Sequence, residues 1–410
     1  MIYIAKLLNK NLMVDPEVQN NFNKVNWYYI NEMIWRLLSN NDYKRFVYQG
    51  KKEVINKYAI IKHIKINPDN KNHYLFYLKE IYFLACVKKS RYFAEIIDVF
   101  TSEDCQNLFI VLKDEGFDLI DLINSKEYKK IPDIIINIIF SITCGLKILH
   151  SYGLSHNDIK PGNIIISATG KVKICDMGST DNFNIIRKFG FGTNCYYSPQ
   201  NLVGKERTQK DDMWALGVVF LEFLVKKEEK EKEKEEKKEG SKIEDQKKKV
   251  WYEPLFYFNG NNEKEKLLID ILKNFYKIGT HGRGLNQKSK DSDYNEVVNY
   301  IKDNEYTLFE SKFNFDKYPF IKDDYKIIIE NLLEIDPNKR WDAEKVFKFH
   351  IFDGLRRSFD QPNIDYLKTD YDKYFLNLFN LDVNDFKKYL EDIKQKFLGN
   401  EYSSQLNNIH

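Results

Sequence analysis

The residues with the clearest chemical meaning lie between His156 and Asn163. This stretch reads His-Asn-Asp-Ile-Lys-Pro-Gly-Asn, and another acid, Asp176, follows two short apolar runs. A carboxylate that accepts a hydroxyl proton, an ammonium group, an amide oxygen and a second carboxylate are what transfer of a magnesium-bound phosphoryl group requires. We therefore expect Asp158 to orient and deprotonate the acceptor hydroxyl and Lys160 to neutralise charge on the moving group. Asn163 and Asp176 are then the expected oxygen ligands of Mg²⁺.

The spacing of these residues resembles that of the eukaryotic protein kinases. In that family the catalytic loop reads H-R-D-x-x-x-x-N and the metal-binding loop reads D-F-G. Asp158 and Asn163 stand at the family's separation, and Asp176-Met177-Gly178 takes the place of D-F-G. The form D-x-K-P-x-N is similar to the serine/threonine kinases rather than the tyrosine kinases. The resemblance implies ATP and Mg²⁺ as cofactors and a serine or threonine hydroxyl of a protein as the acceptor.

Three further segments resemble kinase motifs and follow in the family's order. Residues 192–200 are similar to the end of an activation segment, where the family has G-T-x-x-Y followed by A-P-E. Residues 212–217 are similar to the buried helix that anchors the catalytic loop through its aspartate, here Asp212. Residues 336–340 resemble the D-P-x-x-R turn near the end of the domain. Each segment alone could be an ordinary turn or helix start, but their order supports the resemblance.

The resemblance also implies a nucleotide site upstream of the loop. Residues 58–62 stand where the family has its V-A-I-K strand, so Lys62 is expected to reach the α and β phosphates. Glu80, on the helix that follows, is its expected ion-pair partner. Residues 109–112 form the strand that enters the hinge between the lobes. The side chains expected to surround the nucleotide are Val47, Ile60, Leu112, Lys113, Glu115 and Ile165.

The glycine-rich loop of the family is the largest departure. Its three glycine positions are occupied by Asn40, Asp42 and Arg45. Glycine lets the backbone of that loop approach the phosphates, and a carboxylate at Asp42 would repel them. We therefore expect a weaker nucleotide site than a complete glycine loop would give.

Other departures concern control and packing. Asn157 replaces the arginine that in the family often binds a phosphate on the activation segment, so we expect activity that needs no such phosphate. Met177 replaces phenylalanine and is an apolar filler. Gln200 replaces the A-P-E glutamate; its amide oxygen can still accept a hydrogen bond from Arg340, in a looser segment.

The elements that must position these residues fall into two parts. Residues 35–115 carry short β-prone runs and one helix, and residues 116–352 are mainly helical. This order indicates an α+β fold with a small sheet lobe, a larger helical lobe and ATP between them. The expected strands are 45–49, 57–64, 96–101 and 108–112, and the expected helices are 74–87, 134–151, 210–225, 264–277, 323–333 and 342–349.

Three segments lie apart from this pattern. Residues 1–34 and 353–410 are expected to be terminal extensions, the second helical, with aromatic side chains such as Phe386 packed on the helical lobe. Residues 226–249 read KKEEKEKEKEEKKEGSKIEDQKKK, an insertion with almost no apolar side chain to bury. We expect that insertion to be disordered, or else a solitary solvated helix supported by i,i+4 pairs of Glu and Lys.

The composition excludes some classes of protein and indicates a cellular compartment. The chain has 410 residues, 43% of them hydrophobic, which excludes wholesale disorder. The net charge of +3 is far from the basic balance of a nucleic-acid binder, and no nucleic acid is expected. The five scattered cysteines indicate a reducing, intracellular compartment, cytoplasmic or nuclear. Apolar runs at 134–146 and 214–225 are too short to span a bilayer, so no membrane partner is expected.

Three classes of function stay open at this point. The first is an active serine/threonine protein kinase that uses ATP and Mg²⁺. The second is a pseudokinase, which keeps the fold as a binding or scaffold module and transfers little or no phosphate. The third is a small-molecule phosphotransferase of the aminoglycoside or choline kinase kind, which also has an H-x-D loop but lacks the three downstream segments.

Overall fold

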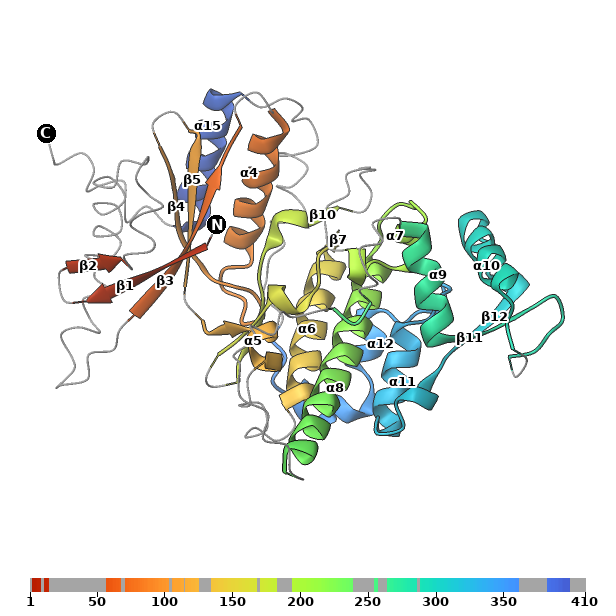
Figure 1. Cartoon of the computed structure of the whole chain (residues 1–410). Coiled ribbons are helices and arrows are strands. Elements are labelled where there is room, and N and C mark those ends of the chain that lie inside the picture. Colours follow the sequence, from red (N-terminus) through yellow and green to blue (C-terminus); the bar gives the residue numbers. More distant parts are fainter. Residues whose placement is uncertain are drawn as a thin grey trace, which may run out of the picture. The chain divides into compact units, whose positions relative to one another are not determined.

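The computed structural model describes residues 2–8, 11–14, 57–67, 71–102, 105–113, 115–124, 134–167, 170–182, 194–238, 254–256, 264–285, 288–360 and 382–398. The chain forms two compact units. Unit 1 consists of residues 1–115 and 362–410, and unit 2 of residues 116–361. Along the chain, the expected boundary between the lobes lies between residues 115 and 116, and the first segment of unit 1 ends at the same place. The fold is α+β, with its elements labelled in Figure 1.

Unit 1 is built on a five-stranded antiparallel sheet with the order β2-β1-β3-β5-β4. Its strands are β1 (Ile2–Leu8), β2 (Asn11–Val14), β3 (Lys57–Lys65), β4 (Ile96–Thr101) and β5 (Asn107–Lys113). The N-terminal segment, expected to be an extension, thus supplies two strands of this sheet. Strands β3 and β5 both contain β-branched and aromatic residues, which favour a pleated surface. The register places Lys62 opposite Ile110.

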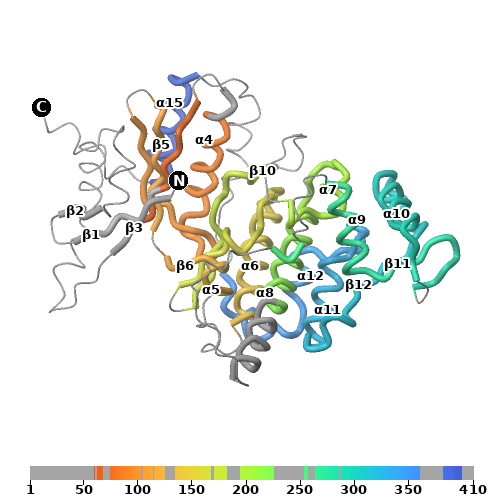
Figure 2. Tube along the Cα trace, in the orientation of Figure 1, coloured from red at the N-terminus to blue at the C-terminus, as the bar shows by residue number. Residues whose placement is uncertain are grey.

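Two helices complete unit 1. They are α4 (Lys71–Cys86) and α15 (Val383–Ile393), which a π-helical turn (Lys394–Leu398) extends. Figures 1 and 2 both show α15 beside α4. The ring of Phe386 lies 5.1 Å from that of Tyr74, and Phe397 lies 5.8 Å from Tyr82. Phe386 therefore packs on unit 1, which corrects the expectation that it packs on the helical lobe.

Unit 2 is mainly helical. Its longer helices are α6 (Ile134–Ser151), α8 (Gln209–Lys238), α9 (Lys264–Phe275), α10 (Asp291–Asp303) and α11 (Asp323–Leu332). Its shorter helices are α5 (Leu119–Asn124), α7 (Pro199–Leu202), α12 (Ala343–Phe347) and α13 (Asp353–Arg356). Helix α8 packs against both α6 and α11. Gly217 permits the close approach to α11, because a Cβ there would lie 2.8 Å from the side chain of Leu332.

Small antiparallel sheets connect these helices. The strands β6 (Phe117–Asp118), β8 (Ile164–Ile166) and β9 (Val172–Ile174) form one, and β7 (Leu154–Ser155) pairs with β10 (Asp181–Asn182). β11 (Tyr276–Thr280) pairs with β12 (Phe309–Phe313). The helix expected over 264–277 therefore ends at Phe275, because Tyr276 enters this pairing and donates its buried hydroxyl to Leu333 O.

The Lys/Glu insertion begins as helix rather than as disordered chain. Helix α8 continues past the expected end at Val225 as far as Lys238, and residues 239–249 lie outside the described residues. For residues 226–238 the helix alternative is the better interpretation, and the sequence places Glu and Lys four residues apart, which favours a helix.

Helix α6 is long and apolar enough to cross a membrane by length and composition, with a mean hydropathy of 1.7 over 18 residues. In unit 2, however, 72% of that stretch is buried inside the protein. This burial is typical of a core helix and agrees with the expectation of a buried helix.

Candidate active site

The polar loop between β7 and β8 holds the expected proton acceptor in a fixed position. Lys160 Nζ lies 2.7 Å from Asp158 Oδ2, and Asn163 Nδ2 donates to the same oxygen at 2.9 Å and to Asp158 O at 2.8 Å. The side chain of Asp158 is 10% exposed. Its second oxygen, Oδ1, receives neither of these contacts. The loop thus fixes Asp158 through Oδ2, and Oδ1 is the oxygen expected to meet an acceptor hydroxyl.

His156 connects this loop to the segment that carries Asp176. Its buried ring has Nε2 3.2 Å from Cys175 O and Nδ1 3.3 Å from the backbone N–H of Asp158. A carbonyl can only accept and an N–H can only donate, so the neutral Nε2–H tautomer satisfies both contacts. The ring therefore ties Asp158 to the residue that precedes Asp176.

Asp212, at the start of α8, anchors the loop as the sequence predicts. It accepts hydrogen bonds from the backbone N–H groups of His156 and Asn157, each at 2.8 Å, and lies 2.9 Å from His150 Nε2. Burial acts to raise the pKa of Asp212, but these hydrogen bonds and the charge of His150 outweigh it, so the pKa is lowered. The carboxylate stays ionised and holds two successive peptide groups.

Asp176 occupies a left-handed backbone conformation, with φ of 61°, directly before the 3₁₀ turn Met177–Ser179. Met177 is fully buried, as expected of an apolar filler. The backbone N–H of Cys175 donates to Asn163 O at 2.9 Å, which holds the segments of the two expected magnesium ligands together. For a non-glycine residue this backbone conformation is uncommon and is found at functional sites.

The donor set fits Mg²⁺ bound with phosphates. Asn163 uses its amide nitrogen for Asp158, which leaves its side-chain oxygen to face a cation, and Asp176 offers a carboxylate. The described residues contain no group of three or more His, Cys, Asp or Glu suited to a metal ion. Mg²⁺ is commonly held by one or two protein oxygens together with substrate phosphates and water, so it needs no such group.

Unit 1 contains the expected phosphate-binding lysine in an ion pair. Lys62 Nζ on β3 lies 2.5 Å from Glu80 Oε1 on α4, and the side chain of Glu80 is 1% exposed. This is the pair that the sequence analysis expects. The partly exposed ammonium is held by a buried carboxylate, so its position is fixed from the protein side.

The residues expected around the nucleotide are placed in part. In unit 1, Ile60 and Leu112 are register partners on β3 and β5, and Lys113 contacts Glu95 at 3.0 Å and Glu115 at 3.9 Å. In unit 2, Ile165 is half-buried on β8. Val47 and the glycine-loop positions Asn40, Asp42 and Arg45 lie outside the described residues, and so do Gly192 and Thr193.

Gln200 and Arg340 form the expected contact at the end of the activation-segment motif. Arg340 Nη2 donates to Gln200 Oε1 at 2.8 Å, while Gln200 Nε2 donates to Ile335 O at 2.8 Å and to the Tyr306 hydroxyl at 3.1 Å. Both side chains are buried. The amide uses its acceptor and its donor, so the segment is held by three hydrogen bonds rather than loosened.

A buried carboxylate outside the expected set, Asp211, is influenced by the charge of the same guanidinium. Asp211 accepts a hydrogen bond from the Ser198 hydroxyl and from Thr208 N at 2.5 Å. Burial raises the pKa of Asp211, and the positive charge of Arg340 opposes that shift. Serine in place of the alanine of A-P-E, together with a second acid before Asp212, was the available sequence signal.

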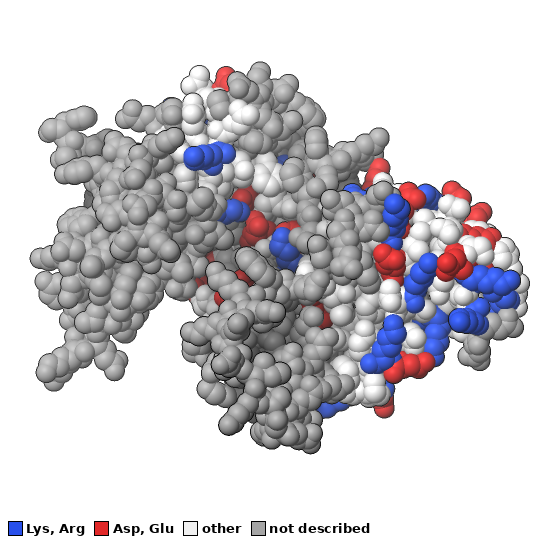
Figure 3. All heavy atoms as spheres, viewed as in Figure 1, with Lys and Arg blue, Asp and Glu red and all other residues white. Residues whose placement is uncertain are grey.

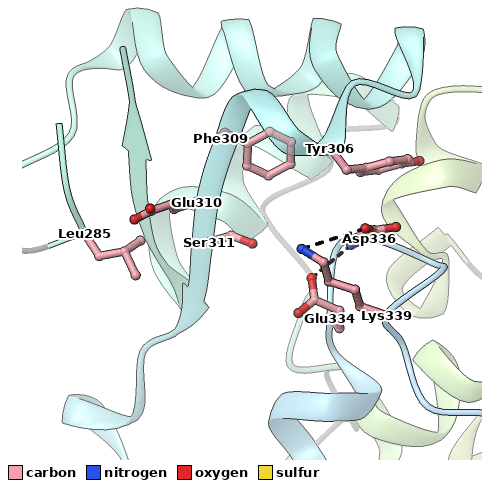
Figure 4. Close-up of a pocket in the computed structure, with 8 residues that line it drawn as sticks. All are labelled: Leu285, Tyr306, Phe309, Glu310, Ser311, Glu334, Asp336 and Lys339. Atoms are coloured by element: carbon pink, nitrogen blue, oxygen red, sulfur yellow. Dashed lines mark hydrogen bonds and ion pairs between the residues drawn. The ribbon is translucent and has the colours of Figure 1, made fainter. Parts of the chain in front are cut away.

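A separate pocket of about 240 Å³ lies beside the contact between Gln200 and Tyr306. None of the expected site residues lines this pocket. Its lining residues are Leu285, Tyr306, Phe309, Glu310, Ser311, Glu334, Asp336 and Lys339 (Figure 4). Lys339 lies 4.0 Å from Asp336, so only part of the pocket's negative charge is balanced there. The pocket shares Tyr306 with the Gln200 contact.

Acidic and basic side chains alternate over α9, α10 and β11. Lys273 pairs with Asp291 at 3.1 Å and Lys302 with Glu265 at 2.9 Å. Figure 3 shows Lys and Arg interspersed with Asp and Glu over this part of unit 2. Such a mixed surface among the described residues gives no support for a polyanion-binding face.

Comparison with known proteins places these motifs in a family. The model of the protein kinase domain matches residues 45–352. A probable serine/threonine-protein kinase of Encephalitozoon cuniculi is 34% identical over 149 residues, which cover 36% of this chain and 28% of that protein. The serine/threonine-protein kinase dkf-1 of Caenorhabditis elegans is 27% identical over 191 residues, 45% of this chain and 25% of that protein.

A third relative comes from yeast. The MAP kinase kinase MKK1/SSP32 of Saccharomyces cerevisiae is 29% identical over 143 residues, which cover 33% of this chain and 27% of that protein. The matched stretches therefore span about a quarter of each of these three relatives.

Proposed function

The chain belongs to the protein kinase family, and from that premise we propose that it transfers the γ-phosphoryl group of ATP to a serine or threonine hydroxyl of a protein. The observation that carries the proposal is the arrangement around Asp158, whose carboxylate is fixed through one oxygen by Lys160 and Asn163. Phosphoryl transfer asks the protein for positioning and charge stabilisation rather than for covalent chemistry.

The roles follow from the geometry of each group. Asp158 orients the acceptor hydroxyl through its second oxygen and takes the proton as the hydroxyl attacks. Lys160, 2.7 Å from Asp158, stabilises the negative charge of the transferring group. Asn163 and Asp176 would hold Mg²⁺, which supplies Lewis-acid stabilisation of the phosphate oxygens when bound.

Unit 1 contributes the phosphate contact expected of Lys62. Glu80 holds Lys62 Nζ at 2.5 Å and so positions the ammonium for contact with the α and β phosphates. Ile60 and Leu112 supply apolar surface for the adenine ring.

Serine or threonine specificity, a protein substrate and an intracellular location belong to the same proposal. The D-x-K-P-x-N form supports serine or threonine specificity, and two of the relatives are named as serine/threonine kinases. All five cysteines are free thiols, which supports a reducing compartment.

The test is label transfer from γ-labelled ATP with Mg²⁺ to a generic basic protein. Wild type should transfer label, and Asp158→Asn and Asp176→Asn should each lower the rate by about 10² or more, since one removes the proton acceptor and the other a metal-ligating charge. Both variants should keep the wild-type melting profile.

Phosphatase treatment before the assay should leave activity largely intact, because Asn157 offers no cation to a phosphate. Equal transfer by wild type and Asp158→Asn, with several acceptors and with Mn²⁺, would remove the enzyme proposal.

A pseudokinase is the second candidate, and one observation favours it. The glycine positions of the phosphate loop carry Asn40, Asp42 and Arg45. Side chains there obstruct the backbone's approach to phosphate. Thermal denaturation with and without Mg²⁺-ATP distinguishes a nucleotide-binding chain, which ATP stabilises by mass action, from one that has lost the nucleotide.

A further inference from the structure

Arg207 lies on the short connection between α7 and α8, and its backbone is fixed from the helix side. Thr208, the next residue, donates from its N–H and from its hydroxyl to Asp211 Oδ2, at 2.5 Å and 3.1 Å. Asp211 N in turn donates to Thr208 O at 3.0 Å. These reciprocal bonds fix the backbone at Thr208, directly after Arg207 and just before α8 begins.

The guanidinium of Arg207 spans two segments of the site. Its Nη1 donates to Asn157 O at 3.1 Å, and its Nη2 donates to the Tyr197 hydroxyl at 2.8 Å. The same guanidinium lies 5.0 Å from the centre of the Tyr197 ring. A planar group with a fixed fork of donors makes these contacts together, which a lysine does not.

The carbonyl that Arg207 contacts belongs to the residue directly before Asp158. Asn157 has a left-handed backbone, with φ of 66°, and its Nδ2 donates to Ser179 O at 2.9 Å and to Ser155 O at 3.2 Å. Its N–H is held by Asp212. A non-glycine residue persists in this conformation when its surroundings hold it there. Arg207 supplies the hold on the carbonyl, which sets the direction of the peptide that leads into Asp158.

Tyr197 connects this contact to the activation-segment motif, residues 192–200, to which it belongs. It is buried, and its ring also lies 5.3 Å from Lys264 Nζ. Burial raises the pKa of Tyr197; the charge of Arg207 opposes that shift and the charge of Asp158 adds to it. The Tyr197 hydroxyl therefore keeps its proton at neutral pH, and the negative charge of Asp158 contributes to this.

We propose that Arg207 is a positioning residue, which holds the catalytic loop through Asn157 O and is itself oriented by Tyr197. Arg207, on the connection before α8, thus contacts the backbone of the residue that stands where the family has its arginine, and this contact involves no phosphate. The inference rests on the proposed kinase function for its catalytic consequence. Its structural part, the hold on the loop, stands independently of activity.

The first arm of the test measures the loop directly. Amide hydrogen exchange of residues 155–160 should be about 10-fold faster in Arg207→Met than in wild type, because the bonds to Asp212 and His156 open more often once the carbonyl is released. Exchange in α11 should not change. Unchanged exchange of residues 155–160 would overturn the proposal even if the chain transfers no phosphate.

The second arm separates kcat from KM. Arg207→Met should lower kcat by about 10- to 100-fold with the KM for ATP within about twofold, because a misplaced Asp158 affects the reaction rather than nucleotide binding. Arg207→Lys should restore part of the loss. Tyr197→Phe should cost about fivefold in kcat, and the double variant Arg207→Met/Tyr197→Phe should be no slower than Arg207→Met alone, since the two side chains act in series.

Lys264→Met is the matched control. It removes the other cation beside the Tyr197 ring but no contact with Asn157, so kcat should stay within about twofold of wild type. A loss equal to that of Arg207→Met would assign the effect to packing around Tyr197 and overturn the positioning role. Absence of transfer by wild type would instead count against the proposed function, with the exchange arm still deciding the role of Arg207.

Discussion

Asp212 accepts two backbone hydrogen bonds from the catalytic loop while its own side chain is almost fully buried. Such a carboxylate is stable only because the groups that it positions also satisfy it. Asp212 and the loop therefore stabilise each other. A change in either should alter both stability and activity.

Asp212→Asn should make the protein less stable by about 3 kcal/mol at neutral pH, because an amide oxygen replaces a carboxylate at two backbone donors and His150. The folded-state pKa of Asp212 lies below the ordinary value of 3.8. Its stabilisation is therefore complete above that value and is lost as the pH falls through the lowered pKa.

Urea unfolding at pH 7 and at pH 3 measures this prediction. The difference in unfolding free energy between wild type and Asp212→Asn should be larger at pH 7 than at pH 3, because the stabilisation by the carboxylate is lost in acid. A difference that grows as the pH falls would contradict the assignment of the charged form.

Gln200 shows why the family pattern alone misjudges this segment. A glutamate at this position would pair with Arg340, yet the amide also donates to Ile335 O and Tyr306. The negative charge of Asp211 already acts on the guanidinium. Gln200→Glu should therefore destabilise the protein by about 1–2 kcal/mol, since it loses a donor and sets a second negative charge near Asp211.

The double variant Gln200→Glu/Asp211→Asn is the control for this change. It moves the acid back to the family's position and should recover part of the lost melting temperature. A higher melting temperature for Gln200→Glu alone would show that Asp211 does not serve as the counter-charge.

Local spacing was enough to predict the groups around Asp158, because Lys160 and Asn163 are two and five residues away. Arg207 and Asp211 could not be found in the same way. Their partners, Asn157 and Ser198, are 50 and 13 residues distant, and nothing in the charged run at 205–207 distinguishes a buried contact from a solvated one.

At the scale of elements, helices with a long apolar pattern were predicted well. α6 runs from Ile134 to Ser151 as expected, and α4 from Lys71 to Cys86 against the expected 74–87. The partner of an amphipathic helix was less predictable. α15 has a strongly one-sided apolar face, but periodicity tells only that the face is buried and not on which surface.

Phe386→Ala tests the packing of α15 on α4. The side chain is fully buried against Tyr74, so its removal should cost about 3–5 kcal/mol of the free energy of unfolding. Phe117→Ala deletes the same group at a position that is 37% exposed and should cost much less.

Chemical denaturation of both phenylalanine variants gives the comparison. A small loss for Phe386→Ala would show that residues 382–398 contribute little to unit 1. Helix α15 would then be a peripheral addition rather than part of the core of that unit.

At the scale of the whole molecule, the residues expected to bind one nucleotide are divided between two compact units. Lys62 and Glu80 belong to unit 1, whereas Asp158, Asn163 and Asp176 belong to unit 2. The order of motifs along the chain predicted this division. That Lys62 and Asp176 contact the same nucleotide stays a prediction, and it is the one on which the two-lobed mechanism depends.

The final prediction tests this sharing through nucleotide-dependent stability. Mg²⁺-ATP at about 100 times its Kd should stabilise wild type by about 2.7 kcal/mol, seen as a rise in melting temperature. Lys62→Met and Asp176→Asn should each abolish most of that rise, and the double variant should lose no more than either single one, because both residues bind one ligand.

The readout must be the shift caused by ATP and not the melting temperature without it. Lys62→Met leaves the buried Glu80 carboxylate without its lysine, which lowers stability whether or not nucleotide binds. Glu80→Gln combined with Lys62→Met removes that unpaired charge and should restore the baseline but not the response to ATP.

A full response to ATP in Lys62→Met would mean that unit 2 binds the nucleotide without unit 1. If each single variant lost only about half of the response and the double variant lost all of it, there would instead be two independent sites. In either case a single nucleotide held by both units would be wrong.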